Sequence, residues 1–165
     1  MSFEADLKWG EEGEELVTKW LTERGFVVAP LYQFNTESAP VLLSKNQTLL
    51  SPDLSVFRDN RAFFAEIKRK KRWVKSRENG LETGYNMKHH RHYMEVRRLT
   101  GLPVWAVFIH EDQQPTGLYT VEIGSALCRV WDGLHCKTKR RVSRPMVFYQ
   151  FNNLYKLSGF EECSA

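Results

Sequence analysis

The spacing of hydrophobic positions predicts a chain that alternates between helices and strands. A helical stripe runs through residues 9–21, Gly25 ends it, and a short apolar strand follows at once. A second segment with helical periodicity spans residues 87–100. Asn86 is its expected N-cap and Gly101 follows its end, as is typical of helix boundaries.

Short runs of β-branched and aromatic residues predict strands around these helices. Residues 50–57 and 62–68 form two such runs on either side of the polar pair Asp59-Asn60, which is typical of a hairpin. Residues 104–109 are almost continuously apolar, as expected for a central strand that is covered on both faces. Two further strands are predicted at residues 118–123 and 146–151.

Length and composition indicate one domain. The chain has 165 residues, 42% of them hydrophobic, and no segment rich in Pro, Gly or Ser divides it. We therefore expect a single domain over residues 1–165, with a core at about residues 10–123 and a C-terminal extension at residues 125–165. No apolar run approaches the length of a membrane span, and the three cysteines are widely spaced. We expect a cytoplasmic protein with reduced thiols and no contact with a membrane.

Two carboxylates and a lysine lie on the predicted hairpin. Asp53 comes before the turn, and Glu66-Ile67-Lys68 comes after it. Because side chains two apart on a strand share a face, Glu66 and Lys68 should point the same way, and Asp53 on the neighbouring strand can reach the same point. Carboxylate oxygens hold hard divalent cations, and a lysine beside them can orient an attacking water. The spacing therefore indicates a metal-dependent nuclease site.

The first predicted helix supplies a fourth candidate residue. Glu14 lies three residues before Val17 and seven before Leu21, which places it on the inward side of the helix, whereas Glu15 faces solvent. An inward carboxylate needs a partner, which makes Glu14 a candidate metal ligand. The alternative is that Glu14 only belongs to an acidic helix start, where the helix dipole favours negative charge.

Asp53, Glu66-Ile67-Lys68 and the inward Glu14 together resemble the PD-(D/E)xK nuclease superfamily, which includes restriction endonucleases and small Holliday-junction resolvases. The resemblance covers the first three quarters of the chain. It implies an α/β fold with a restriction-endonuclease-like core, in which a central mixed β-sheet is flanked by helices. It also implies that Mg²⁺ or Mn²⁺ is held by Asp53, Glu66, the backbone carbonyl of Ile67 and Glu14, and that Lys68 positions the attacking water.

A strongly basic run begins at Lys68, although the formal net charge of the whole chain is only +4. Positive charge beside such a site would attract a polyanion, and the alternative is a solvated loop. Trp73 lies within the run and could stack on a base or cover a hydrophobic edge. The start of the second helix adds polar groups. The candidates for contact with nucleic acid are Arg69, Lys70, Lys71, Arg72, Trp73, Lys75, Lys88 and His89.

The sequence thus predicts an enzyme that hydrolyses phosphodiester bonds in DNA with Mg²⁺ or Mn²⁺, and we expect an endonuclease. Cleavage of two strands would require two sites, which leaves a homodimer open, although no interface stripe stands out. Two other functions also stay open. One is a non-catalytic nucleic-acid-binding or assembly module on the same fold, and the other is a nuclease directed at RNA.

Overall fold

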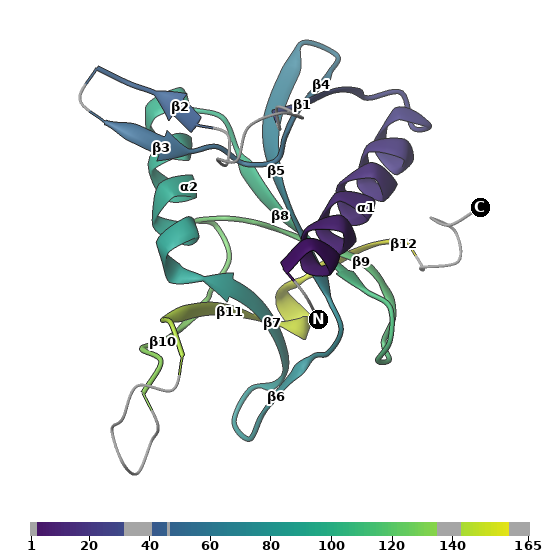
Figure 1. Cartoon of the computed structure of the whole chain (residues 1–165), viewed down its shortest axis with the longest axis vertical. Coiled ribbons are helices and arrows are strands. Elements are labelled where there is room, and N and C mark those ends of the chain that lie inside the picture. The colour runs from purple at the N-terminus through teal and green to yellow at the C-terminus, as the bar shows by residue number, and fades with distance from the viewer. Residues whose placement is uncertain (1–2, 32–40, 46, 135–142, 159–165) are drawn as a thin grey trace.

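A six-stranded mixed sheet lies at the centre of the computed structural model, which describes residues 3–31, 41–45, 47–134 and 143–158 (Figure 1). Its strands are β1 (Val27–Pro30), β4 (Leu54–Arg58), β5 (Arg61–Lys70), β8 (Val104–His110), β9 (Gly117–Glu122) and β12 (Tyr155–Ser158). They lie in the order β1-β4-β5-β8-β9-β12. β5 and β8 are parallel, and the other neighbours are antiparallel.

A second, four-stranded sheet was not predicted. It consists of β6 (Val74–Ser76), β7 (Gly80–Asn86), β10 (Arg129–Trp131) and β11 (Met146–Gln150), in the order β10-β11-β7-β6. A separate hairpin and a short 3₁₀ helix complete the described elements: β2 (Val41–Leu43), β3 (Thr48–Leu50) and η1 (Phe151–Asn153). The predicted strand near residue 146 is therefore present, but it pairs with β7 and not with the central sheet.

One helix covers each face of the central sheet. α1 (Phe3–Thr22) packs Val17 and Leu21 against one face, where Ile67 of β5 is also buried. α2 (Met87–Thr100) packs Tyr93 and Val96 against the other face, in a core that it shares with the second sheet. The predicted central mixed sheet flanked by helices is confirmed.

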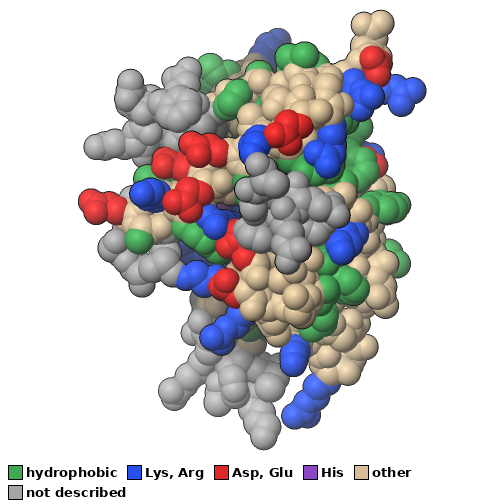
Figure 2. Space-filling view, turned by 90° about the vertical axis from the view of Figure 1, so that its right-hand side faces the viewer, with side chains coloured by type: hydrophobic (Ala, Val, Ile, Leu, Met, Phe, Trp, Pro, Cys, Tyr) green, Lys and Arg blue, Asp and Glu red, His purple; other side chains and the backbone are tan. Residues whose placement is uncertain are grey.

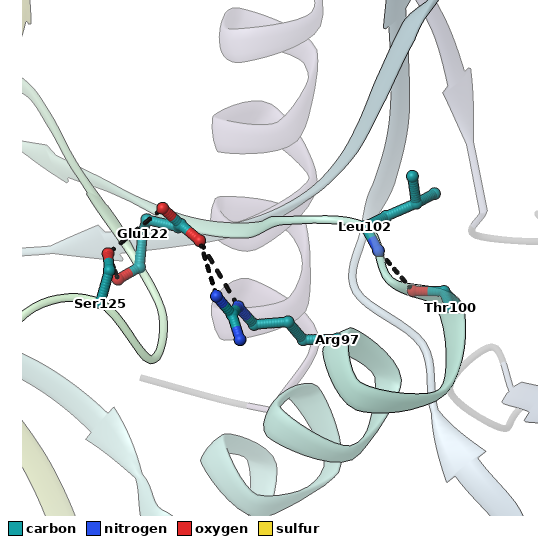
Figure 3. A network of polar contacts seen from close by, with 5 residues as sticks. All are labelled: Arg97, Thr100, Leu102, Glu122 and Ser125. Atoms are coloured by element: carbon teal, nitrogen blue, oxygen red, sulfur yellow. Dashed lines mark hydrogen bonds and ion pairs between the residues drawn. The ribbon is translucent and has the colours of Figure 1, made fainter.

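Both ends of α2 are fixed by polar contacts. The Asn86 side chain accepts a hydrogen bond from the backbone N–H of Lys88 at 2.8 Å, so the predicted N-cap is confirmed. At the other end Gly101 is left-handed, with φ 70°. Figure 3 shows Arg97 of this last turn reaching Glu122 of β9, with a nitrogen–oxygen distance of 3.3 Å. These contacts attach α2 to the central sheet.

The segment before α2 is a strand although it contains a glycine. Gly84 lies within β7 and is paired with Phe148 of β11. A Cβ atom placed on Gly84 would lie 1.9 Å from the carbonyl oxygen of Val147. Glycine is therefore needed here because the two backbones approach closely.

Two further findings concern membrane-spanning helices and the cysteines. No helix in the described ranges is long and apolar enough to cross a membrane. Cys128 has a free, exposed thiol. Cys136 and Cys163 lie outside the described residues.

We predict that Gly84→Ala lowers the free energy of unfolding by about 3 kcal/mol, because β7 and β11 must separate to admit the methyl group. Chemical denaturation measures the change. Gly10→Ala is the matched control: a Cβ at Gly10 of α1 meets nothing within 4 Å, so this variant should be at least as stable as the wild type. Equal stability of the two variants would contradict the close approach of the two strands.

Candidate active site

β5 extends beyond the end of its neighbour β4. The last pair at this end joins Leu54 to Ala65, so Glu66 and the residues after it have no β4 residue beside them. Asp53 takes the place of the missing strand, because its Oδ2 accepts the N–H of Ile67 at 2.7 Å. The N–H and the carbonyl of a strand residue point to the same side. The Ile67 carbonyl therefore also lies at this open edge.

Glu66 and Lys68 form an ion pair beside the open edge. Lys68 Nζ contacts Glu66 Oε1 and also donates to the carbonyl oxygen of Ile67 at 3.1 Å. Glu66 is 1% exposed, and its second oxygen, Oε2, is buried without a hydrogen-bond partner among the residues that the structure describes. Strand alternation places both side chains on the face that α2 covers, while Ile67 packs beneath α1.

Glu14 reaches this group from α1. It is half-buried, and the charges of Asp53 and Lys68 act on it. Burial, and then the Asp53 carboxylate, raise the pKa of Glu14 to about 7, although Lys68 opposes the change. The structure therefore brings Glu14 close to Asp53 and Lys68.

The site holds more negative charge than its lysine offsets. Burial, and then Glu66, raise the pKa of Asp53 to about 7, against the opposing effects of Lys68 and the Ile67 N–H. Burial disfavours the charged form of Lys68, but Glu66 and Asp53 outweigh it and raise the pKa of Lys68 above its ordinary value. Lys68 is thus held as a cation among three carboxyl groups.

α2 contributes two further side chains to the site. Tyr93 is buried, and its pKa is raised by burial and by the nearby Glu66 and Asp53 carboxylates. His89, one helical turn earlier, is half-buried, and burial and the charge of Lys68 lower its pKa to about 4. His89 was predicted on other grounds, but Tyr93 was not assigned to the site. Its polar hydroxyl four residues after His89 was the available signal.

Two of the residues predicted to bind nucleic acid are engaged within the protein. Arg69 points to the α1 side, where it binds Glu111 at 2.6 Å and Glu12 at 2.9 Å. Trp73 is 4% exposed and stacks on His110 with a distance of 3.6 Å between ring centroids. The expectation that Trp73 lies in an exposed basic run is corrected, because the turn after β5 folds its ring into the core beside His110.

The other predicted nucleic-acid contacts are divided by exposure. Lys70 is half-buried, as is His89. The remaining members of the predicted set are exposed: Lys71, Arg72, Lys75 and Lys88.

Comparison with known proteins bears on the fold. No protein-family model matches the chain, and no curated protein matches its sequence significantly. Its structure resembles that of Archaeoglobus fulgidus Hjc, a Holliday junction resolvase from an archaeal hyperthermophile, with a TM-score of 0.52. The match covers 87% of this chain and 89% of the resolvase chain at 11% sequence identity. The fold is restriction-endonuclease-like. The fold class predicted from the sequence is thereby confirmed.

Within this restriction-endonuclease-like fold, the open edge of β5 offers oxygen ligands of the kind that Mg²⁺ and Mn²⁺ take. Among the described residues, no three His, Cys, Asp or Glu side chains are grouped so as to hold a metal ion by themselves. Mg²⁺ is, however, usually bound through only one or two carboxylates and retains several waters. Asp53, the buried Oε2 of Glu66 and the Ile67 carbonyl fit that pattern.

The raised carboxyl pKa values predict how the stability of the metal-free protein depends on pH. Asp53 titrates near 3.8 when unfolded and at about 7 when folded. The folded state therefore binds more protons between these values, and stability falls as the pH rises through this window. We expect Asp53→Asn, which still accepts from Ile67, to melt a few degrees above the wild type at pH 8 and close to it at pH 5.

Thermal melting with and without Mg²⁺ at pH 8 checks this prediction. Mg²⁺ should raise the melting temperature of the wild type, because a ligand that binds the folded state stabilises it, and should have less effect on Asp53→Asn. A wild type that is more stable at pH 8 than Asp53→Asn without metal would contradict the excess of negative charge at the site.

Proposed function

We propose that this protein is a metal-dependent endonuclease that hydrolyses phosphodiester bonds in DNA. The observation that carries the proposal is the grouping of the buried Glu66 and the half-buried Asp53 and Glu14 around Lys68 at the open edge of β5. A non-catalytic binding module would have no use for this grouping, because acidic side chains repel a phosphate. The fold shared with a Holliday junction resolvase supports the proposal.

Asp53 and Glu66 would hold Mg²⁺ or Mn²⁺ together with the Ile67 carbonyl, and Glu14 would extend the site through water. The chemistry that a bound cation supplies here is stabilisation of the negative charge that develops on the scissile phosphate. The protein contributes rigid placement of these oxygens. Asp53 is fixed by the Ile67 N–H, and Glu66 is fixed by Lys68.

Lys68 orients the attacking water in this proposal. Its Nζ is held between Glu66 and the Ile67 carbonyl, and its raised pKa keeps it protonated at neutral pH. A protonated lysine donates hydrogen bonds and offsets charge, so Lys68 acts as a donor to the water and to the phosphate. Tyr93 of α2 positions the Glu66 carboxylate, because the Tyr93 side chain is buried beside that carboxylate.

The exposed basic residues around the β6–β7 hairpin would bind the DNA backbone. Arg72, Lys75 and Arg77 are all exposed. The hairpin lies at the lower end of the molecule in Figure 1, and the lowest part of the face in Figure 2 carries Lys and Arg side chains without Asp or Glu. Contacts between basic side chains and phosphates give affinity without sequence selection. Resolution of a junction would additionally require two sites, and hence a homodimer.

Asp53→Asn, Glu66→Gln and Lys68→Met should each reduce cleavage by about 100-fold or more, because each removes a group that stabilises charge at the reacting phosphate. Glu14→Gln should reduce it less. The measurement is cleavage of supercoiled, linear, branched and single-stranded DNA and of RNA, with Mg²⁺, with Mn²⁺ and with a chelator. Glu15→Gln, on the exposed side of the same helix turn, is the control and should cleave normally.

Full activity of any of the first three variants, or cleavage in chelator, would contradict the assigned roles. Preferential cleavage of RNA would replace DNA as the substrate. Binding without cleavage under every condition would favour the non-catalytic module.

Replacing Arg72, Lys75 and Arg77 together by Gln should weaken DNA binding and reduce its salt dependence. Each lost phosphate contact lowers the slope of log K against log salt by about 0.9 for duplex DNA. Fluorescence anisotropy at several salt concentrations measures this slope. An unchanged slope would remove the hairpin from the binding surface.

A further inference from the structure

Lys70 is the third member of a row of ionisable side chains on β5. Glu66, Lys68 and Lys70 alternate along the strand, so they share the face that α2 and the second sheet cover. Successive members of such a row are about 6.6 Å apart. In the parallel register Lys70 is opposite His110 of β8. The row therefore leads from the candidate active site toward the second sheet.

Lys70 differs from Lys68 and Arg69 because its side chain binds no acid among the described residues. Lys68 and Arg69 both form ion pairs. The Lys70 side chain is half-buried and forms no hydrogen bond or ion pair with any residue in the described ranges. His110 beside it is buried and interacts through Nε2 with the Thr83 hydroxyl at 3.1 Å, so it supplies no negative charge.

An unpaired cation in such a place lowers stability. Burial, and then the charge of Lys68, lower the pKa of Lys70 to about 8, with Glu66 opposing only weakly. Partly buried charges are normally paired, because removal from water is costly. An anionic ligand would provide the missing partner, and the neighbouring site is already built for a phosphate.

We propose that Lys70 binds the phosphate adjacent to the scissile phosphate in the nucleic-acid strand that lies along β5. The spacing of the row is comparable with that of successive phosphates along a strand, so one phosphate at Lys68 places the next within reach of Lys70. The inference rests on the proposed function, since the scissile phosphate defines the position of its neighbour. Lys70 is thus a contact that fixes the register of the strand in the site.

The test is a thermodynamic cycle that combines a Lys70 variant of the protein with a chemically modified phosphate in the DNA. Lys70→Met removes the charge but keeps the length of the side chain. A methylphosphonate replaces one phosphate, either before or after the scissile position, and removes its charge. Each change alone should lower kcat/KM by roughly 10- to 100-fold, as expected for a hydrogen bond to a charged group. At one of the two phosphate positions, the methylphosphonate should not lower the kcat/KM of Lys70→Met any further.

Two other variants make the result specific. Lys156→Met, at an exposed position of β12 outside the basic run, should keep the full response to the methylphosphonate. Lys70→Arg should keep it as well, because the charge remains. Lys70→Met itself should melt above the wild type, since it removes an unpaired charge that is half-buried. A lower melting temperature would show that Lys70 already has a partner, and would overturn the proposal.

Additive losses at both phosphate positions would also overturn it. Failure of the wild type to cleave any substrate would refute the proposed nuclease activity separately. In that case the same cycle is measured on DNA affinity by fluorescence anisotropy, where coupling supports the Lys70 contact and additivity refutes it. Absence of both cleavage and binding would refute both proposals.

Discussion

The arrangement of the site depends on the different lengths of β4 and β5. Because β4 begins at Leu54, the N–H of Ile67 has no strand partner on that side, and the Asp53 carboxylate accepts it instead. In a fully paired strand, the sheet itself separates the side chains that lie on its two faces. At this open edge, Glu14 from the α1 side and Glu66 from the α2 side act on the same Asp53.

Local patterns were sufficient to predict the elements that carry the site. The two helices, the hairpin and the central strand β8 follow from hydrophobic spacing, and Asn86 marks the start of α2. The common face of Glu66 and Lys68 follows from strand alternation, and Glu14 is inward because of its spacing from Val17. These features need no knowledge of distant contacts.

The second sheet could not be read from the same patterns, because its central pair joins β7 to β11, which lie far apart in the chain. β7 contains Gly84 and is polar at several positions, and it becomes a strand only because β11 lies beside it. The burial of Trp73 likewise depends on His110, far away in sequence. Tyr93 was not assigned to the site from the sequence, and only the position of Glu66 shows that its hydroxyl lies there.

Calorimetric titration of the metal-free protein with Mn²⁺ tests the central claim most directly, which is that the open edge of β5 forms a divalent-cation site from carboxyl groups with raised pKa values. Titrations in buffers of different ionisation enthalpy count the protons released on binding. The account predicts binding with proton release near pH 6 and much less release at pH 8.5, and greatly weakened binding in Asp53→Asn and Glu66→Gln. Wild-type binding without proton release at pH 6, or equal binding by both variants, would contradict it.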